Sequence, residues 1–421
     1  MPDESKVNNR RTEDSVANQS STAHAVFLTH QPPVPLVSGD RIRNFHLMRQ
    51  LVRRGWSVSL FTLVSGDPPA PADLDSLRSL DIDFEIVPFD RRSGRHRARL
   101  LVDIATRRAV HQDFFGDGTS VSTFHGWLDG REPDVLVSNL YMFKHVPEPL
   151  WPRLVLDSHN AEARRVAGMA SATRTLRAWA AALQVEPVRR YEEDAARAAR
   201  RVVAVSAPEQ RYFEAIVPGK VDLAPNGVDL DSIQMRSSLP SDGSLFFLGA
   251  MDYSANVDAV VHLVDNVLPR INGRDLEFIV AGSNPRRQMF SAAHRAPKHI
   301  RVRVAGFVPD PAPYFEACRA FVVPLRYGGG TRLKILEALA RGVPVVSTST
   351  GCEGLDLEDG KELLIRDQPA DLARAIERLL DDDRLCTQLA QAGRRAVEAR
   401  YGWDAIGDAF ATSLTRALEA R

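Results

Sequence analysis

The chain has 421 residues, more than one hydrophobic core usually supports, so two domains of roughly 200 residues each are expected. Its 54 Lys and Arg residues balance its 54 Asp and Glu residues, so no overall charge attracts nucleic acid, and an anionic surface could be met only by a local patch. Three cysteines without a CxxC pair, Cys318, Cys352 and Cys386, indicate neither a disulfide framework nor a zinc knuckle, and a reducing cytoplasm fits.

The N-terminal segment is polar and charged. We expect residues 1–22 to form a disordered tail, because they have almost no large apolar side chains to bury. They contain no apolar stretch typical of a signal peptide, and nowhere does the chain run about 18 apolar residues as a membrane-spanning helix requires. The prediction is a cytoplasmic protein, soluble or peripheral at the inner face of the membrane.

Residues 23–224 are predicted to form the first domain. Short β-rich runs alternate with helical ones, beginning with strands at 24–30 and 56–64 on either side of a helix at 40–55. Further strands are predicted at 82–89, 134–138, 153–157 and 201–206. This alternation predicts a parallel sheet with helices on both faces.

The alternation pauses at 225–243, where Pro, Gly, Ser and Asp predict a linker, and restarts in the second domain, 244–400. The second domain's strands are predicted at 245–251, 276–282, 300–308, 320–325, 343–348 and 362–365. Residues 401–421 form a final helix, expected to pack back toward the first domain. The expected fold class is α/β, with two Rossmann-like domains facing each other across a cleft that binds the ligands.

Residues 324–342 join a strand to a helix through glycines. Glycines occupy 328–330, Thr331 suits the N-cap, and the predicted helix ends at Gly342. A glycine loop before a helix presents free N–H groups and the positive end of the helix dipole. The pattern therefore predicts a phosphate site.

Two cations and a carboxylate lie on this helix. Arg332 and Lys334 fall in its first turn, where each opposes the helix dipole by roughly 0.3–1 kcal/mol unless an anion binds. Glu337 follows one turn later, and its carboxylate can accept two hydrogen bonds from a vicinal diol such as a ribose. The spacing matches neither GxxxxGK[ST] nor GxGxxG. An ordinary surface helix with a Lys–Glu pair fits the spacing equally well.

Several segments together are typical of one enzyme family. They are "GGGTRLKILEALARGVPVVST" and "GCEGLDLEDGKELLI" within 328–365, "LAPNGVDL" at 223–230, "FLGAMDYSANVDAV" at 247–260, "AGFVPDPAPYF" at 305–315 and "YGWDAI" at 401–406. In the first half, "LVSGDRIRNFHLMRQLVRRGWSVSLFT" and "LDSHNAEARR" resemble the family's glycine loop and histidine segment. From about residue 24 onward the chain resembles the family 4 (group 1) retaining glycosyltransferases of GT-B fold.

The resemblance implies transfer of a sugar from a nucleoside diphosphate donor, UDP or GDP being the expected nucleotides, to an acceptor held mainly by the first domain. His159, Arg332 and Lys334 are the implied catalytic residues, with His159 approaching the donor sugar. The implied donor-binding residues are Glu337 at the ribose, Gly328, Gly329, Gly330, Thr331 and Leu333 around the diphosphate, Gly306, Phe307 and Val308 at the base, and Ser38 and Gly39 against the phosphates.

The chain departs from the family pattern in two places. The glutamate that the family commonly places eight positions before the ribose-binding one is Gly329 here, so recognition of the sugar must rest partly on other groups. The family's Arg and Lys pair at the diphosphate falls near Ala250 and Asn256, which carry no charge. We therefore predict that Arg332 and Lys334 replace that pair.

Retaining chemistry of this family lets the leaving phosphate oxygen take the acceptor proton, so no protein base is required, and cations at the diphosphate stabilise the charge that develops. No pair of acids argues for a glycosidase site. Pairs of DxD form occur at Asp73 and Asp75, Asp81 and Asp83, and Asp229 and Asp231. They are predicted to be solvated turns, and neither a metal nor another cofactor is expected to be required.

Residues 91–111 carry seven arginines and one aspartate. They fit a solvated helix face, or a basic patch that contacts an anionic membrane or an anionic acceptor. Residues 163–201 are predicted as a long amphipathic helix, with the acids 192–194 in surface ion pairs. Asp157 and Asn160 are expected to cap the helix that starts near 161.

Three other functions remain open. A sugar-nucleotide epimerase shares the architecture but needs acidic groups in the cleft. A catalytically idle nucleotide-sugar-binding subunit is suggested by Gly329. A nicotinamide oxidoreductase is least favoured, because no GxGxxG follows the first strand.

Overall fold

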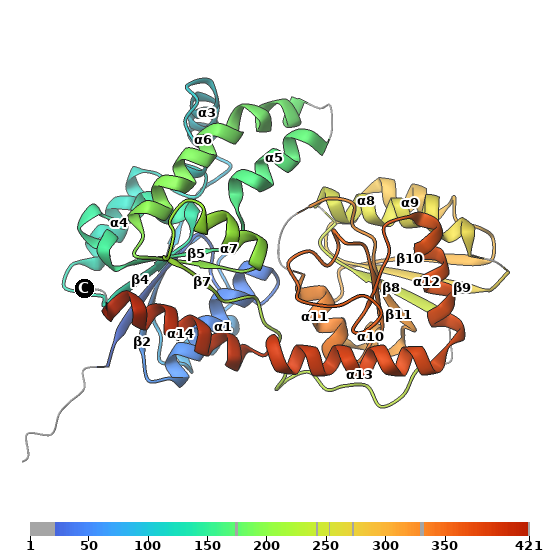
Figure 1. Ribbon diagram of the computed structural model, residues 1–421. Coiled ribbons are helices and arrows are strands. Elements are labelled where there is room, and N and C mark those ends of the chain that lie inside the picture. The colour runs from blue at the N-terminus through green and yellow to red at the C-terminus, as the bar shows by residue number, and fades with distance from the viewer. Residues whose placement is uncertain are drawn as a thin grey trace, which may run out of the picture.

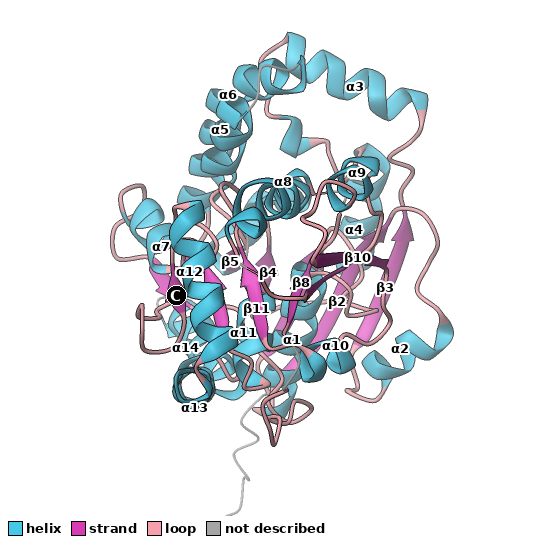
Figure 2. Cartoon of the chain, turned by 90° about the vertical axis from the view of Figure 1, so that its right-hand side faces the viewer, coloured by secondary structure: helices cyan, strands magenta, loops and turns pink. Residues whose placement is uncertain are grey.

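The computed structural model describes residues 22–172, 176–240, 243–251, 253–271, 273–328 and 332–419, so nearly all of the predicted N-terminal tail lies outside it. Two α/β lobes lie side by side, and the C-terminal helix returns to the first lobe (Figure 1). Figure 2 shows the strands of both lobes flanked by helices.

The first sheet is parallel and, in the described residues, has seven strands in the order β3-β2-β1-β4-β5-β6-β7. The strands are β1 (His24–Thr29), β2 (Ser57–Val64), β3 (Asp83–Pro88), β4 (Val135–Ser138), β5 (Leu154–Ser158), β6 (Arg201–Ala204) and β7 (Val221–Leu223). The sequence did not predict β7, a three-residue strand whose central Asp222 accepts hydrogen bonds from Arg201 and Ser413.

Helices cover both faces of this sheet. They are α1 (Gly39–Arg53), α2 (Pro71–Arg78), α3 (Gly94–Ala105), α4 (Gly118–Leu128), α5 (Glu162–Ala172), α6 (Leu176–Ala198) and α7 (Ala207–Glu214), with the short turns η1 (Val110–Gln112), η2 (Leu140–His145) and η3 (Glu148–Arg153). The prediction of one long helix over 163–201 is wrong, because α5 and α6 are separate and pack against each other. Together with α3 they project from the lobe (Figure 1).

The second sheet is also parallel, in the order β10-β9-β8-β11-β12-β13. Its strands are β8 (Ser244–Leu248), β9 (Leu276–Ala281), β10 (Ile300–Gly306), β11 (Ala320–Val323), β12 (Val345–Ser347) and β13 (Leu364–Ile365). The surrounding elements are α8 (Ser254–His262), η4 (Leu263–Val267), η5 (Leu268–Arg270), α9 (Arg287–Ala293), α10 (Ala312–Ala317), α11 (Leu333–Ala340), α12 (Pro369–Asp381) and α13 (Asp383–Arg400).

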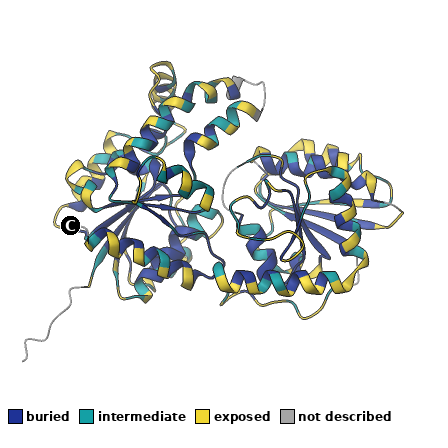
Figure 3. Ribbon diagram, viewed as in Figure 1, coloured by how far each residue is buried: buried dark blue, intermediate teal, exposed yellow. Residues whose placement is uncertain are grey.

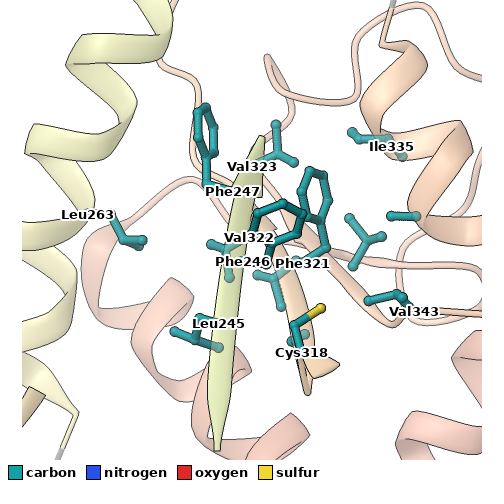
Figure 4. Close-up of a cluster of buried hydrophobic side chains, with 14 of the residues drawn as sticks. Leu245, Phe246, Phe247, Leu263, Cys318, Phe321, Val322, Val323, Ile335 and Val343 are labelled. Atoms are coloured by element: carbon teal, nitrogen blue, oxygen red, sulfur yellow. The ribbon is translucent and has the colours of Figure 1, made fainter. Parts of the chain in front are cut away.

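Apolar side chains fill the space on both faces of the central strands. Phe246 and Phe247 are adjacent on β8, point to opposite faces and are both fully buried, beside Phe321 of β11 and Ile335 of α11 (Figure 4). The sheets of both lobes are buried throughout their centres (Figure 3). Such strands are continuously apolar because helices cover both faces.

The chain passes between the lobes twice. The first crossing follows β7, and the second leads from α13 into α14 (Trp403–Glu419), where the amide of Val228 donates to the carbonyl of Tyr401 at 2.8 Å. Helix α14 then packs on the first sheet, with the ring of Phe410 centred 6.3 Å from that of Phe27. The two lobes are therefore connected by two segments of the chain that are hydrogen-bonded to each other.

Loops at the carboxyl ends of the two sheets meet between the lobes. A Cβ at Gly354, in the loop after β12, would lie 3.0 Å from the Cβ of Ser206, which follows β6. In both sheets the strand order reverses beside the first strand, and ligands of such sheets bind outside the strand ends at that point.

Replacing Phe410 by alanine should destabilise the first lobe, because its ring is fully buried between α14 and the sheet. The expected loss is about 3–5 kcal/mol of unfolding free energy. Urea unfolding followed by tryptophan fluorescence measures it, and Thr415→Ala, on the exposed side of the same helix, is the control. Equal unfolding midpoints for the two variants would contradict this packing.

Candidate active site

The glycine segment precedes α11 in the second lobe. Gly329, Gly330 and Thr331 lie outside the described residues, and Gly328 has φ +114, so a Cβ there would be strained and would lie 2.5 Å from the Tyr253 hydroxyl oxygen. The helix begins at Leu333 with Arg332 at the N-cap, not Thr331 as predicted. It is no ordinary surface helix, because most of its side chains are buried.

Arg332 braces this segment. Its side chain is 5% exposed, and Nη2 donates to the carbonyl oxygens of Gly328 at 2.9 Å and Thr350 at 2.7 Å. Burial lowers the pKa of the guanidinium. The cation therefore lies between the glycine segment and the loop after β12.

Lys334 reaches across to the loop that follows β8. Its Nζ donates to Asn256 Oδ1 at 3.0 Å and lies 4.5 Å from the centre of the Phe247 ring. A Cβ at Gly249 would lie 2.6 Å from Nζ, so this glycine leaves the room that the ammonium occupies. The Asn256 amide in turn donates to the carbonyl of Ala250 at 2.7 Å. Lys334 thus contacts Asn256, one of the two positions at which the family pattern has a cation, and Asn256 in turn contacts the other position, Ala250.

The surroundings of Lys334 disfavour its charge. Desolvation, followed by repulsion from Arg332, lowers the pKa of Lys334 to about 7. The amide oxygen of Asn256 offers less compensation than a carboxylate would. A bound anion would supply that compensation.

Glu337 pairs with Arg341 rather than with Lys334. Both Nε and Nη2 of Arg341 donate to Oε1, at 3.2 and 3.0 Å. Burial raises the pKa of Glu337, and Arg341 only partly offsets that effect. This pairing leaves Oε2 available for a diol.

The predicted base-binding residues lie at the end of β10, where Gly306 is the last residue of the strand and Phe307 and Val308 follow it. Gly306 has φ +74, and its carbonyl accepts from the amide of Gly282 at 2.8 Å. Phe307 is 64% exposed, so its ring face is open to stacking, and Val308 is partly exposed beside it.

The first lobe contributes the N-terminus of α1. Ser38 is the N-cap and Gly39 the first helical residue. Ser38 Oγ has no hydrogen-bond partner in the part of the chain that the structure describes, although it is buried. A hydroxyl and free N–H groups at a helix N-terminus suit an anion.

His159 lies directly after β5 between two carboxylates. Its Nδ1 is 3.0 Å from Asp40 Oδ1 and its Nε2 is 3.0 Å from Asp157 Oδ2. Burial lowers the pKa of His159, but Asp40 and Asp157 outweigh burial and raise it to about 10. His159 is therefore an imidazolium at neutral pH, with both N–H groups donated to carboxylates rather than to a sugar.

The predicted capping roles of Asp157 and Asn160 are wrong, and the Asn160 amide instead donates to Glu162 Oε1 at 3.5 Å. Asp157 accepts a bidentate pair of hydrogen bonds from Arg43, which is 1% exposed, besides the one from His159. The amide of Glu162 at the start of α5 donates to Glu192 Oε1 at 2.6 Å. Glu192 is thus buried, not a surface residue as predicted, and burial raises its pKa to about 7.

Two family models match the chain. One, described as Glycosyltransferase Family 4, matches residues 39–232, and the other, described as Glycosyl transferases group 1, matches residues 242–382. The chain belongs to the family 4 glycosyltransferases of GT-B fold.

Curated relatives of this glycosyltransferase include the lipopolysaccharide core biosynthesis glycosyltransferase LpsE of Rhizobium meliloti, 35% identical over 26% of this chain and 33% of the relative. The D-inositol 3-phosphate glycosyltransferase of Xylanimonas cellulosilytica is 25% identical over 93% of this chain and 94% of the relative. The chain spans only part of two other relatives. Its match covers 33% of the length of LpsE and 49% of the length of a 2-deoxystreptamine glucosyltransferase of Streptomyces kanamyceticus.

Solved structures show the same fold. Sucrose-phosphate synthase from Thermosynechococcus elongatus superposes with a TM-score of 0.70 at 19% identity, covering 95% of this chain and all of that one (100%). HepE from Anabaena, in complex with UDP and glucose, superposes with a TM-score of 0.61 at 15% identity, covering 93% and 99%.

The glycosyltransferase has a cavity of about 530 Å³ in its first lobe. His30, Asp40, Asn139 and His159 line it from the strand ends and α1, and α3, α5 and α6 complete its wall. Sequence reasoning missed this cavity, because α3 and α6 are far apart in the chain.

A hydrogen-bonded cluster lies in the cavity wall. Glu162 Oε2 accepts from the Tyr141 hydroxyl at 3.2 Å and from Arg165 Nε at 2.7 Å, and lies 3.1 Å from His111 Nε2. His111 and Arg165 outweigh burial and lower the pKa of Glu162. Its carboxylate is therefore ionised at neutral pH and already paired with the Arg165 guanidinium.

No group of three or more His, Cys, Asp or Glu side chains that could hold a metal is found among the described residues of the glycosyltransferase. The predicted DxD acids at Asp75 and Asp229 pair with Arg78 and Arg49. None of the helices in the described ranges is long and apolar enough to span a membrane.

Replacing Lys334 by methionine should lower the affinity of the glycosyltransferase for a nucleoside diphosphate at least tenfold, because the buried ammonium is lost while the shape is kept. In the unaltered protein the affinity should fall as pH rises above about 7, where Lys334 loses its proton. In Lys334→Met it should not change with pH in that range. Titration calorimetry at several pH values measures both effects, and Lys361→Met, at an exposed lysine of the same lobe, is the control.

The same substitution should alter the pH dependence of stability. Between about 7 and the ordinary value of 10.5, Lys334 carries a proton in the unfolded chain but not in the folded one, so its contribution to stability rises with pH. Lys334→Met should remove that slope.

The affinity experiment has its own contradicting outcome. If Lys334→Met binds the nucleoside diphosphate as tightly as Lys361→Met at every pH, Lys334 does not bind the diphosphate.

Proposed function

We propose that the protein is a retaining glycosyltransferase that moves a sugar from a nucleoside diphosphate sugar to an acceptor hydroxyl. The acceptor belongs to a surface polysaccharide, a lipid-linked intermediate or a secondary metabolite. The observation that carries the proposal is the position of the Lys334 ammonium, which contacts Asn256 and lies next to Gly249. Lys334 follows the glycine segment in the chain and lies one helical turn before Glu337. These groups suit a diphosphate and a ribose in the order in which a nucleotide presents them.

Charge stabilisation would provide most of the catalysis. Cleavage of the donor's glycosidic bond leaves negative charge on the diphosphate, which Lys334, Arg332 and the N-termini of α11 and α1 would stabilise. A leaving phosphate oxygen would take the acceptor proton on the same face. His159, already an imidazolium, fits an electrostatic and orienting role rather than that of a base.

The sharpest test concerns the ribose. The unaltered protein should bind UDP or GDP roughly 10- to 100-fold more tightly than the matching 2′,3′-dideoxynucleotide, because a charged hydrogen-bond acceptor contributes about 1.5–3 kcal/mol. Glu337→Gln, which keeps a partner for Arg341, should largely abolish that preference, whereas Glu316→Gln, at an exposed site in the same lobe, should keep it. Thermal shift with a panel of nucleoside diphosphates selects the nucleotide, since a ligand at 100 times its Kd adds about 2.7 kcal/mol.

Turnover separates the enzyme from its rivals. Donor consumption in the presence of cell extract, absent in Glu337→Ala, supports a transferase. Nucleotide binding without turnover favours an idle subunit, and conversion of the donor to an isomer favours an epimerase. The donor site itself fails if no nucleoside diphosphate raises the melting temperature.

Contact with an anionic membrane through 91–111 is also proposed. Leu101 and Val102 of α3 are 67% and 56% exposed, and Arg95 and Arg97 are exposed on the same helix. Apolar side chains flanked by cations are typical of helices that lie on anionic lipid.

The protein should therefore sediment with vesicles that contain phosphatidylglycerol and not with phosphatidylcholine alone, and salt should weaken the binding. The double variant Leu101→Glu, Val102→Glu should lose it. Phe290→Glu, at an exposed apolar site in the second lobe, should keep it. If the double variant and Phe290→Glu sediment with the phosphatidylglycerol vesicles to the same extent, α3 is not the contact surface.

A further inference from the structure

The cavity in the first lobe has an apolar wall. Ile104 of α3, Met169 of α5, and Ala180 and Ala181 of α6 line it. The rings of Phe114, Phe115 and Tyr141 also line it, and Phe115 and Tyr141 lie 5.0 Å apart between centroids. At about 530 Å³ the cavity falls in the range that holds a complete small ligand rather than a single sugar ring.

Three polar atoms in the same wall have no hydrogen-bond partner within the described ranges. They are His111 Nδ1, Asn139 Oδ1 and Gln184 Nε2, on side chains that are 4%, 6% and 4% exposed. Buried polar groups are normally hydrogen-bonded, so these atoms point to a ligand with polar groups of its own. Hydroxyls fit best, because a hydroxyl can both donate and accept.

The charges in the cavity are already balanced. Arg165 is bound to Glu162, and His159 is held between Asp40 and Asp157. An anionic ligand would meet the acidic side chains of Asp40, Glu162 and Glu192 in the lining, and the lowered pKa values of Asp40 and Glu162 keep these two ionised at neutral pH. A neutral ligand is therefore favoured over a phosphorylated one.

Exposed apolar side chains lie close in the chain to lining residues of the cavity. Trp179, next to the lining residue Ala180, is 60% exposed, and Leu101 and Val102 precede the lining residue Ile104 on α3. An apolar group longer than the cavity would pass over these side chains.

From these observations we infer that the cavity binds the acceptor and that the acceptor is a neutral amphiphile, with hydroxyls toward the strand ends and an apolar group between α3, α5 and α6. This inference rests on the proposed function, because it names the substrate that receives the sugar at that site. A lipid and a soluble aglycone share this chemistry, and the vesicle experiment above distinguishes the two sources.

The probes are n-octyl β-D-glucopyranoside, below the concentration at which it forms micelles, and methyl β-D-glucopyranoside. By titration calorimetry the octyl glucoside should bind at least tenfold more tightly, since burial of a few CH₂ groups suffices for that ratio. Ala181→Trp, which fills the cavity, should weaken octyl glucoside binding at least tenfold. Ala182→Trp, exposed one residue further along α6, should leave it unchanged. Met169→Gln, a gentler change in the wall, should weaken it in the same direction if Ala181→Trp does not fold.

Nucleotide binding, measured in the same variants, keeps the two proposals apart. Loss of octyl glucoside binding with intact UDP or GDP binding supports the acceptor cavity. The acceptor cavity is overturned if the unaltered protein binds the two glucosides equally well. It is also overturned if Ala181→Trp and Met169→Gln both bind octyl glucoside as tightly as Ala182→Trp does. If no nucleotide binds the unaltered protein, the proposed function fails, and the glucoside result still decides whether the cavity takes an amphiphile.

Discussion

The buried guanidinium of Arg43 connects the parts on which the site depends. It holds Asp157 at the end of β5 with Nε and Nη2, and its Nη1 donates to the carbonyl oxygens of Ala224 and Pro225 and to Asn226 Oδ1 where the chain leaves the first lobe. Loss of one partner of a buried ion pair usually costs about 3–5 kcal/mol, because the other charge stays buried. The position of His159 and the path of the first interlobe crossing are therefore fixed by one side chain.

Local pattern was enough to predict most strands, because a strand covered on both faces must be apolar along its whole length. It failed where tertiary contacts decide. Strand β7 is only three residues long and includes Asp222, which is stabilised by Arg201 and by Ser413 of α14. Likewise α5 and α6 are separate helices that pack against each other, and the helical pattern of 163–201 gave no sign of it.

The candidate site was likewise predictable only where its residues are close together in the chain. The glycines, Lys334 and Glu337 are neighbours in the chain, so spacing was compatible with a phosphate beside a ribose, and the family resemblance implied a diphosphate. The groups that receive the Lys334 ammonium, Gly249 and Asn256, are separated from it by many residues and meet it only because β8 and β11 are adjacent. No spacing rule connects them, and none connects Arg43 with Asp157 or Ile104 with Ala181.

The two lobes surround a buried cation with opposite kinds of group, and this difference bears on where the phosphates of the proposed donor would lie. In the first lobe His159 meets two carboxylates, so its pKa rises to about 10 and the charge is balanced before any ligand arrives. In the second lobe Lys334 meets an amide oxygen and a neighbouring cation, so its pKa falls to about 7. A diphosphate would gain little at the first site and would restore the favourable charge of the second. Under the proposed function, the donor phosphates would therefore lie nearest α11, and the balanced site beside His159 would receive neutral sugar and acceptor hydroxyls.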